Sequence, residues 1–241
     1  MTMMTLKQYL KSNTAVRPPV PSAEWWTPTA RSRGKRHFKF ANKGSSRGVA
    51  VVDDTAVEGE SRDERIGMLV LRARPDTRRV VEQSPQVEYV DADGEVHVHT
   101  FDLHVHRMDD KKVAVDFKPA KLVKHSEIRE LHAVLARRIS PRTADELLVL
   151  TPAMYTAADV YNAELMHTLT RQDFPDDDET VLRLVRRMKG PAPIADLVAR
   201  SKLAGYGFNS VVRAIAEGHL RMTERRRIEC GAVVAPARSE A

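Results

Sequence analysis

The chain has 241 residues, of which 42% are hydrophobic and 30% are charged, a composition and length that fit a globular protein with a substantial core. The formal net charge is +6, but residues 1–52 alone hold ten Lys and Arg against one acid, Glu24, so the remaining residues sum to −3. Cys230 is the only cysteine, which excludes an intrachain disulfide and a cysteine-rich zinc site and indicates a reducing compartment.

Neither a secretory signal nor a membrane span is visible in the sequence. The first residues contain no apolar stretch of signal-peptide length, and no apolar run approaches the roughly 20 residues that cross a bilayer. We therefore expect a soluble protein of the cytoplasm or nucleoid, without membrane contact.

Residues 1–38 are predicted to form an extended arm, because prolines surround Trp25 and Trp26. Basic residues interleaved with aromatic ones run from Arg31 to Arg47, a pattern that suits contact with a nucleic-acid backbone. An edge strand protected by lysines, or a solubilising tail, would have a similar composition. The predicted DNA contacts are Arg31, Arg33, Lys35 and Arg36 of the arm and Lys39, which follows it directly.

A central region of mixed α and β structure is predicted from residue 39 to residue 174. Apolar spacing indicates a helix from about Val57 to Arg74, which Pro75 ends. Alternating patterns, separated by two turns of hairpin type, then predict four strands. The strands are Arg79–Glu82, Gln86–Val90, Val96–His106 and Lys112–Phe117, followed by a helix near His125–Arg138, a strand Leu147–Leu150 and a helix Ala157–Leu169.

A second, smaller domain is predicted for residues 175–241. Its pattern is helical over Glu179–Lys189, Pro193–Arg200 and Phe208–Glu217, and a closing hairpin then ends in a return strand Ile228–Val234. Three helices with such a hairpin are typical of a winged helix. Its wing would be Arg225, Arg226 and Arg227, and the domain would bind either DNA or a protein partner.

Asp116 and Lys118 are the most informative residues of the central region. Residues i and i+2 of a strand share a face, so an acid and a lysine would project together. A solvated strand end would carry the same residues without any chemistry. The preceding strand adds Asp102 and the upstream helix adds Glu64, and carboxylates with a lysine are what a metal-dependent phosphodiesterase needs.

From Ser61 to Pro119 the chain resembles the TnsA-type transposase endonuclease, a member of the restriction-endonuclease-like PD-(D/E)xK nucleases. The resemblance extends over roughly residues 39–235 and depends on the order of several short motifs. These are Ser61-Arg62-Asp63-Glu64, Arg74-Pro75-Asp76, Val80-Val81-Glu82-Gln83-Ser84-Pro85, Thr100-Phe101-Asp102, Val115-Asp116-Phe117-Lys118-Pro119 and Tyr161-Asn162-Ala163-Glu164-Leu165.

The resemblance implies an α/β fold: a restriction-endonuclease-like core with a mixed central sheet, followed by a small winged-helix domain. Glu64, Asp102 and Asp116 would be the catalytic carboxylates that bind Mg²⁺ or Mn²⁺, Lys118 the catalytic lysine, and Gln83 a pocket residue. The chain departs from the family at three of these motifs. Phe101 stands where a proline usually precedes the central aspartate, Gln83-Ser84-Pro85 replaces a Gln-Pro pair, and Asp116 replaces the commoner and longer glutamate.

The function implied by the resemblance is cutting of the 5′ strands at transposon ends in bacterial double-stranded DNA. The expected partners are a TnsB-like DDE transposase and a TnsC-like AAA+ ATPase. A stand-alone nuclease of phage, defence or repair is an alternative. A catalytically silent DNA-binding assembly factor is another. Four histidines, His97, His99, His104 and His106, are too extended along the chain for one zinc site, and we interpret them mostly as polar-face strand residues.

Overall fold

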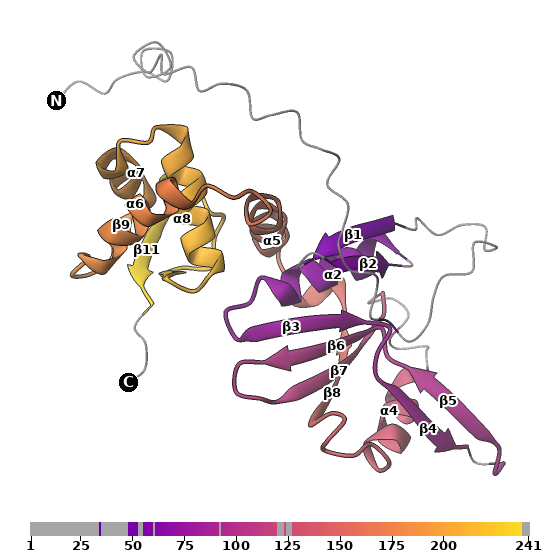
Figure 1. Cartoon of the computed structure of the whole chain (residues 1–241). Coiled ribbons are helices and arrows are strands. Elements are labelled where there is room, and N and C mark those ends of the chain that lie inside the picture. Colours follow the sequence, from indigo (N-terminus) through magenta and orange to yellow (C-terminus); the bar gives the residue numbers. More distant parts are fainter. Residues whose placement is uncertain are drawn as a thin grey trace.

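A four-stranded mixed sheet forms the centre of the fold (Figure 1). The computed structural model describes residues 34, 48–52, 55–59, 61–91, 93–119, 123 and 127–237. In sheet order the strands are β3 (Thr77–Glu82), β6 (Leu103–Arg107), β7 (Lys112–Phe117) and β8 (Glu146–Leu150). The first three are antiparallel, whereas β7 and β8 are parallel and are joined through α4 (Ile128–Ala136). The predicted α/β class with a mixed sheet is confirmed.

The side chains of β7 alternate between two layers of the core. Its odd-numbered residues, from Val113 to Phe117, pack with α2 (Arg62–Arg72) on one face of the sheet. Ala114 packs with Leu135 of α4 on the other face. Asp116 shares the parity of Ala114, so the last acid of β7 lies on the α4 side.

Gly67 allows α2 to approach the sheet closely. A Cβ atom at this position would lie 3.0 Å from the Phe117 ring and 3.1 Å from Leu150. At the start of α2 the hydroxyl of Ser61 accepts a hydrogen bond from the N–H of Glu64 at 3.1 Å. The close contact at Gly67 therefore holds the first turn of α2, which carries Glu64, near the end of β7.

Two antiparallel hairpins accompany the central sheet (Figure 1). One consists of β1 (Gly48–Val52) and β2 (Thr55–Gly59), and the other of β4 (Gln86–Val90) and β5 (Val96–Thr100). The predicted start of the first helix at Val57 is wrong, because that residue pairs with Ala50 in the β1–β2 hairpin. The helix begins five residues later, after the Ser61 cap.

The single strand predicted for Val96–His106 is two strands in two different sheets. The chain leaves β5 at Phe101, whose N–H donates to the carbonyl of Pro85, and the carbonyl of Asp102 accepts from the N–H of Gln83. Before these two residues β5 pairs with β4, and after them β6 pairs with β3 and β7. The apolar positions change parity at the break, from Val96 and Val98 to Phe101, Leu103 and Val105, and this sign of it was overlooked in the single-strand prediction.

The C-terminal part consists of three helices and a small antiparallel sheet in the order β10-β11-β9 (Figure 1). The predicted return strand Ile228–Val234 begins too early, because residues 229–232 form a turn before β11. The helices are α6 (Pro175–Arg186), α7 (Ile194–Ser201) and α8 (Gly205–Ala216), and the strands are β9 (Ala192–Pro193), β10 (Leu220–Met222) and β11 (Val233–Pro236).

Helix α5 (Ala157–Leu169) contacts both parts of the chain. It packs beside α2 and α8. Its residues Leu165, Met166 and Leu169 join the apolar core that α6, α7 and α8 form. The predicted domain boundary at residue 175 falls after this helix and stays a prediction.

A short 3₁₀ helix, Pro152–Met154, links β8 to α5. Among the residues that the structure describes, none of the helices has the length and apolar character needed to cross a membrane.

Candidate active site

Asp102 lies at the break between β5 and β6, where the backbone holds it from two sides. The N–H of Phe117, on β7, donates to Oδ2 of the Asp102 carboxyl group at 2.7 Å. The N–H of Gln83, which follows β3, donates to the Asp102 carbonyl, also at 2.7 Å. The carboxyl group is thus fixed at the junction of three strands.

The charges of the other predicted catalytic residues act on Asp102. The pKa of the Asp102 carboxyl is raised to about 7, chiefly by burial and in addition by the negative charges of Asp116 and Glu64. The Phe117 N–H bond and the positive charge of Lys118 lower the same pKa but do not outweigh the burial. The structure therefore brings Glu64, Asp116 and Lys118 together around Asp102.

Asp116 is buried and carries two imidazole partners. Nε2 of His99, on β5, lies 2.8 Å from Oδ2 of Asp116, and Nε2 of His132, on α4, lies 2.7 Å from the same oxygen. Burial opposes ionisation of this carboxyl, but the hydrogen bonds and charges of His132 and His99 outweigh it, so the pKa of Asp116 is lowered. Asp116 is thereby ionised at neutral pH.

The histidine pair was largely missed by the sequence analysis. His132 lies on a helix that covers the sheet, and no spacing rule connects it with Asp116. His99 lies three residues before Asp102, which is the signal that could have drawn attention to it. The other strand histidines lie elsewhere: His97 is 2.6 Å from Asp91, and Nε2 of His104 is 2.9 Å from the carbonyl of Thr143.

Phe101 completes this cluster. It is fully buried, its ring meets the His99 ring edge-on at 4.7 Å between centroids, and the His132 ring lies 5.8 Å away. Two of the three departures from the TnsA-type pattern noted in the sequence, Phe101 and Asp116, therefore lie in the same packed group of side chains.

Gln83 contributes to the site through its backbone. The residue is buried and adopts a positive φ of 45° at the end of β3, immediately before β4 turns away from the central sheet. This conformation aims its N–H at the carbonyl of Asp102. The predicted pocket residue therefore lies next to the central aspartate.

The carboxylate oxygens of Glu64, Asp102 and Asp116 are the kind of ligand that a hard divalent cation prefers. No set of three His, Cys, Asp or Glu side chains within the described ranges is arranged to hold a metal ion. Mg²⁺ commonly uses only one or two protein carboxylates and completes its shell with water. Burial is the main cause of the raised pKa of Asp102, and the negative charges of Asp116 and Glu64, which a cation would offset, add to it.

The three arginines predicted to form a wing contact the protein itself. Arg225 forms an ion pair with Asp159 of α5 at 2.5 Å, and Arg226 pairs with Glu229. The guanidinium of Arg227 lies 5.0 Å from the centre of the Tyr161 ring. The predicted DNA contacts Arg31, Arg33, Lys35, Arg36 and Lys39 lie outside the described residues.

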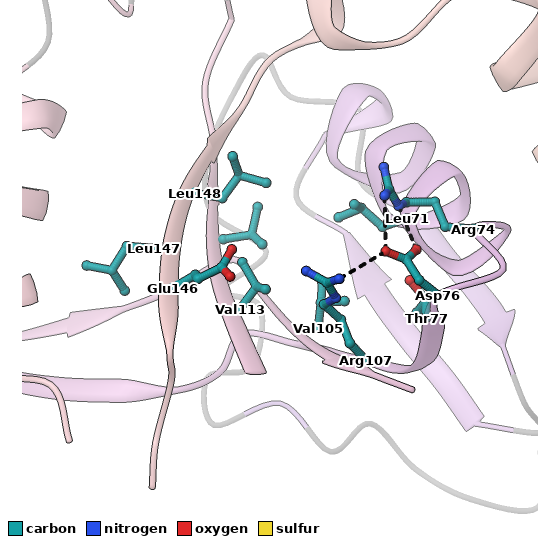
Figure 2. A pocket seen from close by; sticks show the side chains of 11 residues that line it. Leu71, Arg74, Asp76, Thr77, Val105, Arg107, Val113, Glu146, Leu147 and Leu148 are labelled. Carbon is teal, nitrogen blue, oxygen red and sulfur yellow. Dashed lines mark hydrogen bonds and ion pairs between the residues drawn. The ribbon is translucent and has the colours of Figure 1, made fainter. Parts of the chain in front are cut away.

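A cavity of about 180 Å³ lies at the opposite end of the central sheet (Figure 2). Leu71 of α2 and Leu148 of β8 contribute apolar walls, and Asp76 pairs at its edge with Arg74 at 2.9 Å and with Arg107 at 3.7 Å. The cavity borders the start of β7, whereas Asp116 and Lys118 are at the end of that strand. It is therefore separate from the candidate active site.

Comparisons of the sequence with models of known protein families and with curated proteins found no match.

Proposed function

We propose that the chain is a metal-dependent DNA endonuclease, the TnsA-like subunit of a heteromeric transposase. The observation that carries the proposal is that Glu64, Asp116 and Lys118 lie close enough to the half-buried carboxyl of Asp102 for their charges to act on its pKa. These residues come from one helix and the ends of separate strands. Carboxylates and an ammonium group around one point are suited to hydrolysis of a phosphodiester bond.

The finer fold assignment is part of the same proposal. A mixed sheet with helices on both faces, whose strand ends carry the acids, supports a restriction-endonuclease-like core. Three helices followed by a small antiparallel sheet support a winged helix in the C-terminal part. This part would bind flanking DNA or a partner subunit.

Asp102 and Asp116, with Glu64 beside them, would hold Mg²⁺ or Mn²⁺. When bound, such a cation polarises phosphoryl oxygens and lowers the pKa of a coordinated water. Lys118 places a positive charge beside Asp102, where the ammonium group can orient the scissile phosphate. Only in its neutral amine form would Lys118 receive a proton from the attacking water. The N–H groups of Phe117 and Gln83 keep Asp102 in position during the reaction.

Under this proposal the protein acts in the bacterial cytoplasm at the nucleoid, where it cuts the 5′ strands at transposon ends. A TnsB-like DDE transposase would cut and join the 3′ strands, and a TnsC-like AAA+ ATPase would contact the C-terminal part. The basic arm would hold double-stranded DNA near the carboxylates, because each phosphate contact adds affinity that depends on salt.

The decisive experiment measures 5′-strand cutting at the ends of the mobile element, with both partner proteins present. Asp102→Ala and Lys118→Ala are expected to reduce cutting by at least about 10²-fold, whereas DNA binding persists. Asp93→Ala and Lys111→Ala, which change exposed residues of the two hairpin turns, are the matched controls. Full cutting by Asp102→Ala would refute the proposal, and cutting without partners would indicate a stand-alone nuclease.

A second candidate, a catalytically silent assembly factor, is favoured by one observation. Oδ2 of Asp116 already has two partners, His99 and His132, so that this carboxylate could serve packing alone. In that case Asp102→Ala would support transposition at the wild-type level, and only substitutions that remove DNA or partner contacts would reduce it.

A further inference from the structure

Two imidazole rings from different elements converge on a single oxygen atom. His99 approaches Oδ2 of Asp116 from β5 at 2.8 Å, and His132 approaches it from α4 at 2.7 Å. Since an ionised carboxylate only accepts hydrogen bonds, both Nε2 atoms must carry the donated proton. Such bonds to a charged acceptor are shorter and stronger than those between neutral groups.

The surroundings fix both rings as well as the carboxylate. The side chain of Asp116 is 4% exposed, that of His132 12% and that of His99 18%. Phe101, which is fully buried, packs against both imidazoles. The arrangement is therefore held by β5, by the β5–β6 junction and by α4 together.

This geometry distinguishes the two oxygens of Asp116. Rotation of the carboxylate would break both hydrogen bonds to Oδ2 inside a water-poor site, where unmade hydrogen bonds are costly. Oδ1 is the oxygen left to bind a ligand. Partners behind a metal-binding side chain orient it in this way and commonly influence metal affinity as strongly as they influence activity.

We propose that His99 and His132 are positioning residues that hold Oδ2 of Asp116 and thereby select Oδ1 as the oxygen that binds a divalent cation beside Asp102. This inference depends on the proposed function, because it assigns the cation to the same site. It adds two residues from outside the acid and lysine motifs, and it gives the shorter Asp116 side chain a fixed orientation.

The test measures Mn²⁺ binding to the full chain by calorimetry and by electron paramagnetic resonance, without DNA or turnover. His99→Leu and His132→Leu remove the donors but keep apolar bulk, and each is expected to weaken Mn²⁺ affinity about 10- to 100-fold. His97→Leu is the matched control: this β5 histidine bonds Asp91 instead, and the variant should bind as the wild type does.

Glutamine and asparagine variants separate positioning from folding. His132→Gln can still present an N–H donor near the Nε2 position, whereas the shorter amide of His132→Asn cannot reach it, so only the first should retain affinity. If the leucine variants fail to fold, the comparison of His132→Gln with His132→Asn tests the positioning role instead. Wild-type affinity in His132→Asn and in a folded His99→Leu would overturn the positioning role alone. Absence of Mn²⁺ binding to the wild type would overturn both this role and the metal-dependent function.

Discussion

Asp102 and Asp116 lie in one site, yet the protein shifts their pKa values in opposite directions. Burial, with the charges of Asp116 and Glu64, raises the pKa of Asp102 to about 7, whereas the bonds from His132 and His99 prevail over burial at Asp116 and lower its pKa. The two carboxyls therefore differ in protonation just below neutral pH. This difference provides a measurable signature of the site.

The stability of the metal-free protein should fall as pH rises from about 4 to about 7. In this window folded Asp102 holds a proton that the unfolded chain, with a pKa near 3.8, has released, so the free energy of unfolding decreases as pH increases. At about 1.4 kcal/mol per pKa unit the change is of order 4 kcal/mol. Denaturant titrations in EDTA at pH 4, 5.5 and 7.5 would measure it.

Asp102→Asn should remove this part of the pH dependence, because the amide does not titrate and can still accept the Phe117 N–H bond. Asp93→Asn, at an exposed turn, should leave the dependence as in the wild type. Identical pH profiles for Asp102→Asn and the wild type would contradict the assignment of the raised pKa to Asp102.

Gly67→Ala should destabilise the protein although alanine is the better helix former by about 1 kcal/mol. The added Cβ would meet the Phe117 ring at 3.0 Å and Leu150 at 3.1 Å inside the core, and overpacking of this kind costs about 1–3 kcal/mol. Urea titration would measure the loss. Gly190→Ala, where nothing lies within 4 Å of the new atom, should be close to neutral, and an equal loss there would contradict the packing argument.

Asn162→Ala should loosen the segment between β10 and β11. The Asn162 side chain donates to the carbonyl of Arg226 at 2.8 Å and accepts from the N–H of Ile228 at 2.7 Å. Loss of both bonds is expected to cost about 1–3 kcal/mol in urea titrations. Thr168→Ala, at an exposed position of the same helix, is the control, and faster hydrogen exchange at Ile228 should appear only in Asn162→Ala.

Neutralising the basic arm should weaken DNA binding and reduce its dependence on salt. Each lost phosphate contact reduces the magnitude of the slope of log K against log salt by about 0.9, so replacing five cations reduces it by up to about 4.5. The substitutions are Arg31→Ala, Arg33→Ala, Lys35→Ala, Arg36→Ala and Lys39→Ala. Arg226→Ala, whose side chain already pairs with Glu229, should leave the slope unchanged. An unchanged slope in the five-residue variant would exclude the arm as a DNA contact.

Local sequence patterns were sufficient to predict a helix or strand whose bounds do not depend on contacts with other elements. The strands Gln86–Val90 and Lys112–Phe117 and the helix Ala157–Leu169 were predicted residue for residue. The two strands are short apolar segments bounded by hairpin turns, which a local pattern can delimit. The shared face of Asp116 and Lys118 was expected from strand periodicity alone and stays a prediction.

The rest depends on contacts between elements. The break at Phe101 arises because β5 pairs with β4 whereas β6 pairs with β3 and β7. The parity of the apolar residues changes there, but the partners of the two strands cannot be read from that change. His132 reaches Asp116 only after α4 packs on the sheet face where Ala114 and Asp116 lie. Likewise, Arg225 looked like a free wing residue until α5 brought Asp159 beside it.

Helix α5 has a consequence for how the molecule responds to its surroundings. Because Leu169 lies in the C-terminal core while the same helix packs beside α2, neither part can open without disturbing the other. Heat or denaturant should therefore produce one cooperative unfolding transition instead of two. A partner that binds the C-terminal helices would by the same contact restrain α2, and with it the carboxylate of Glu64.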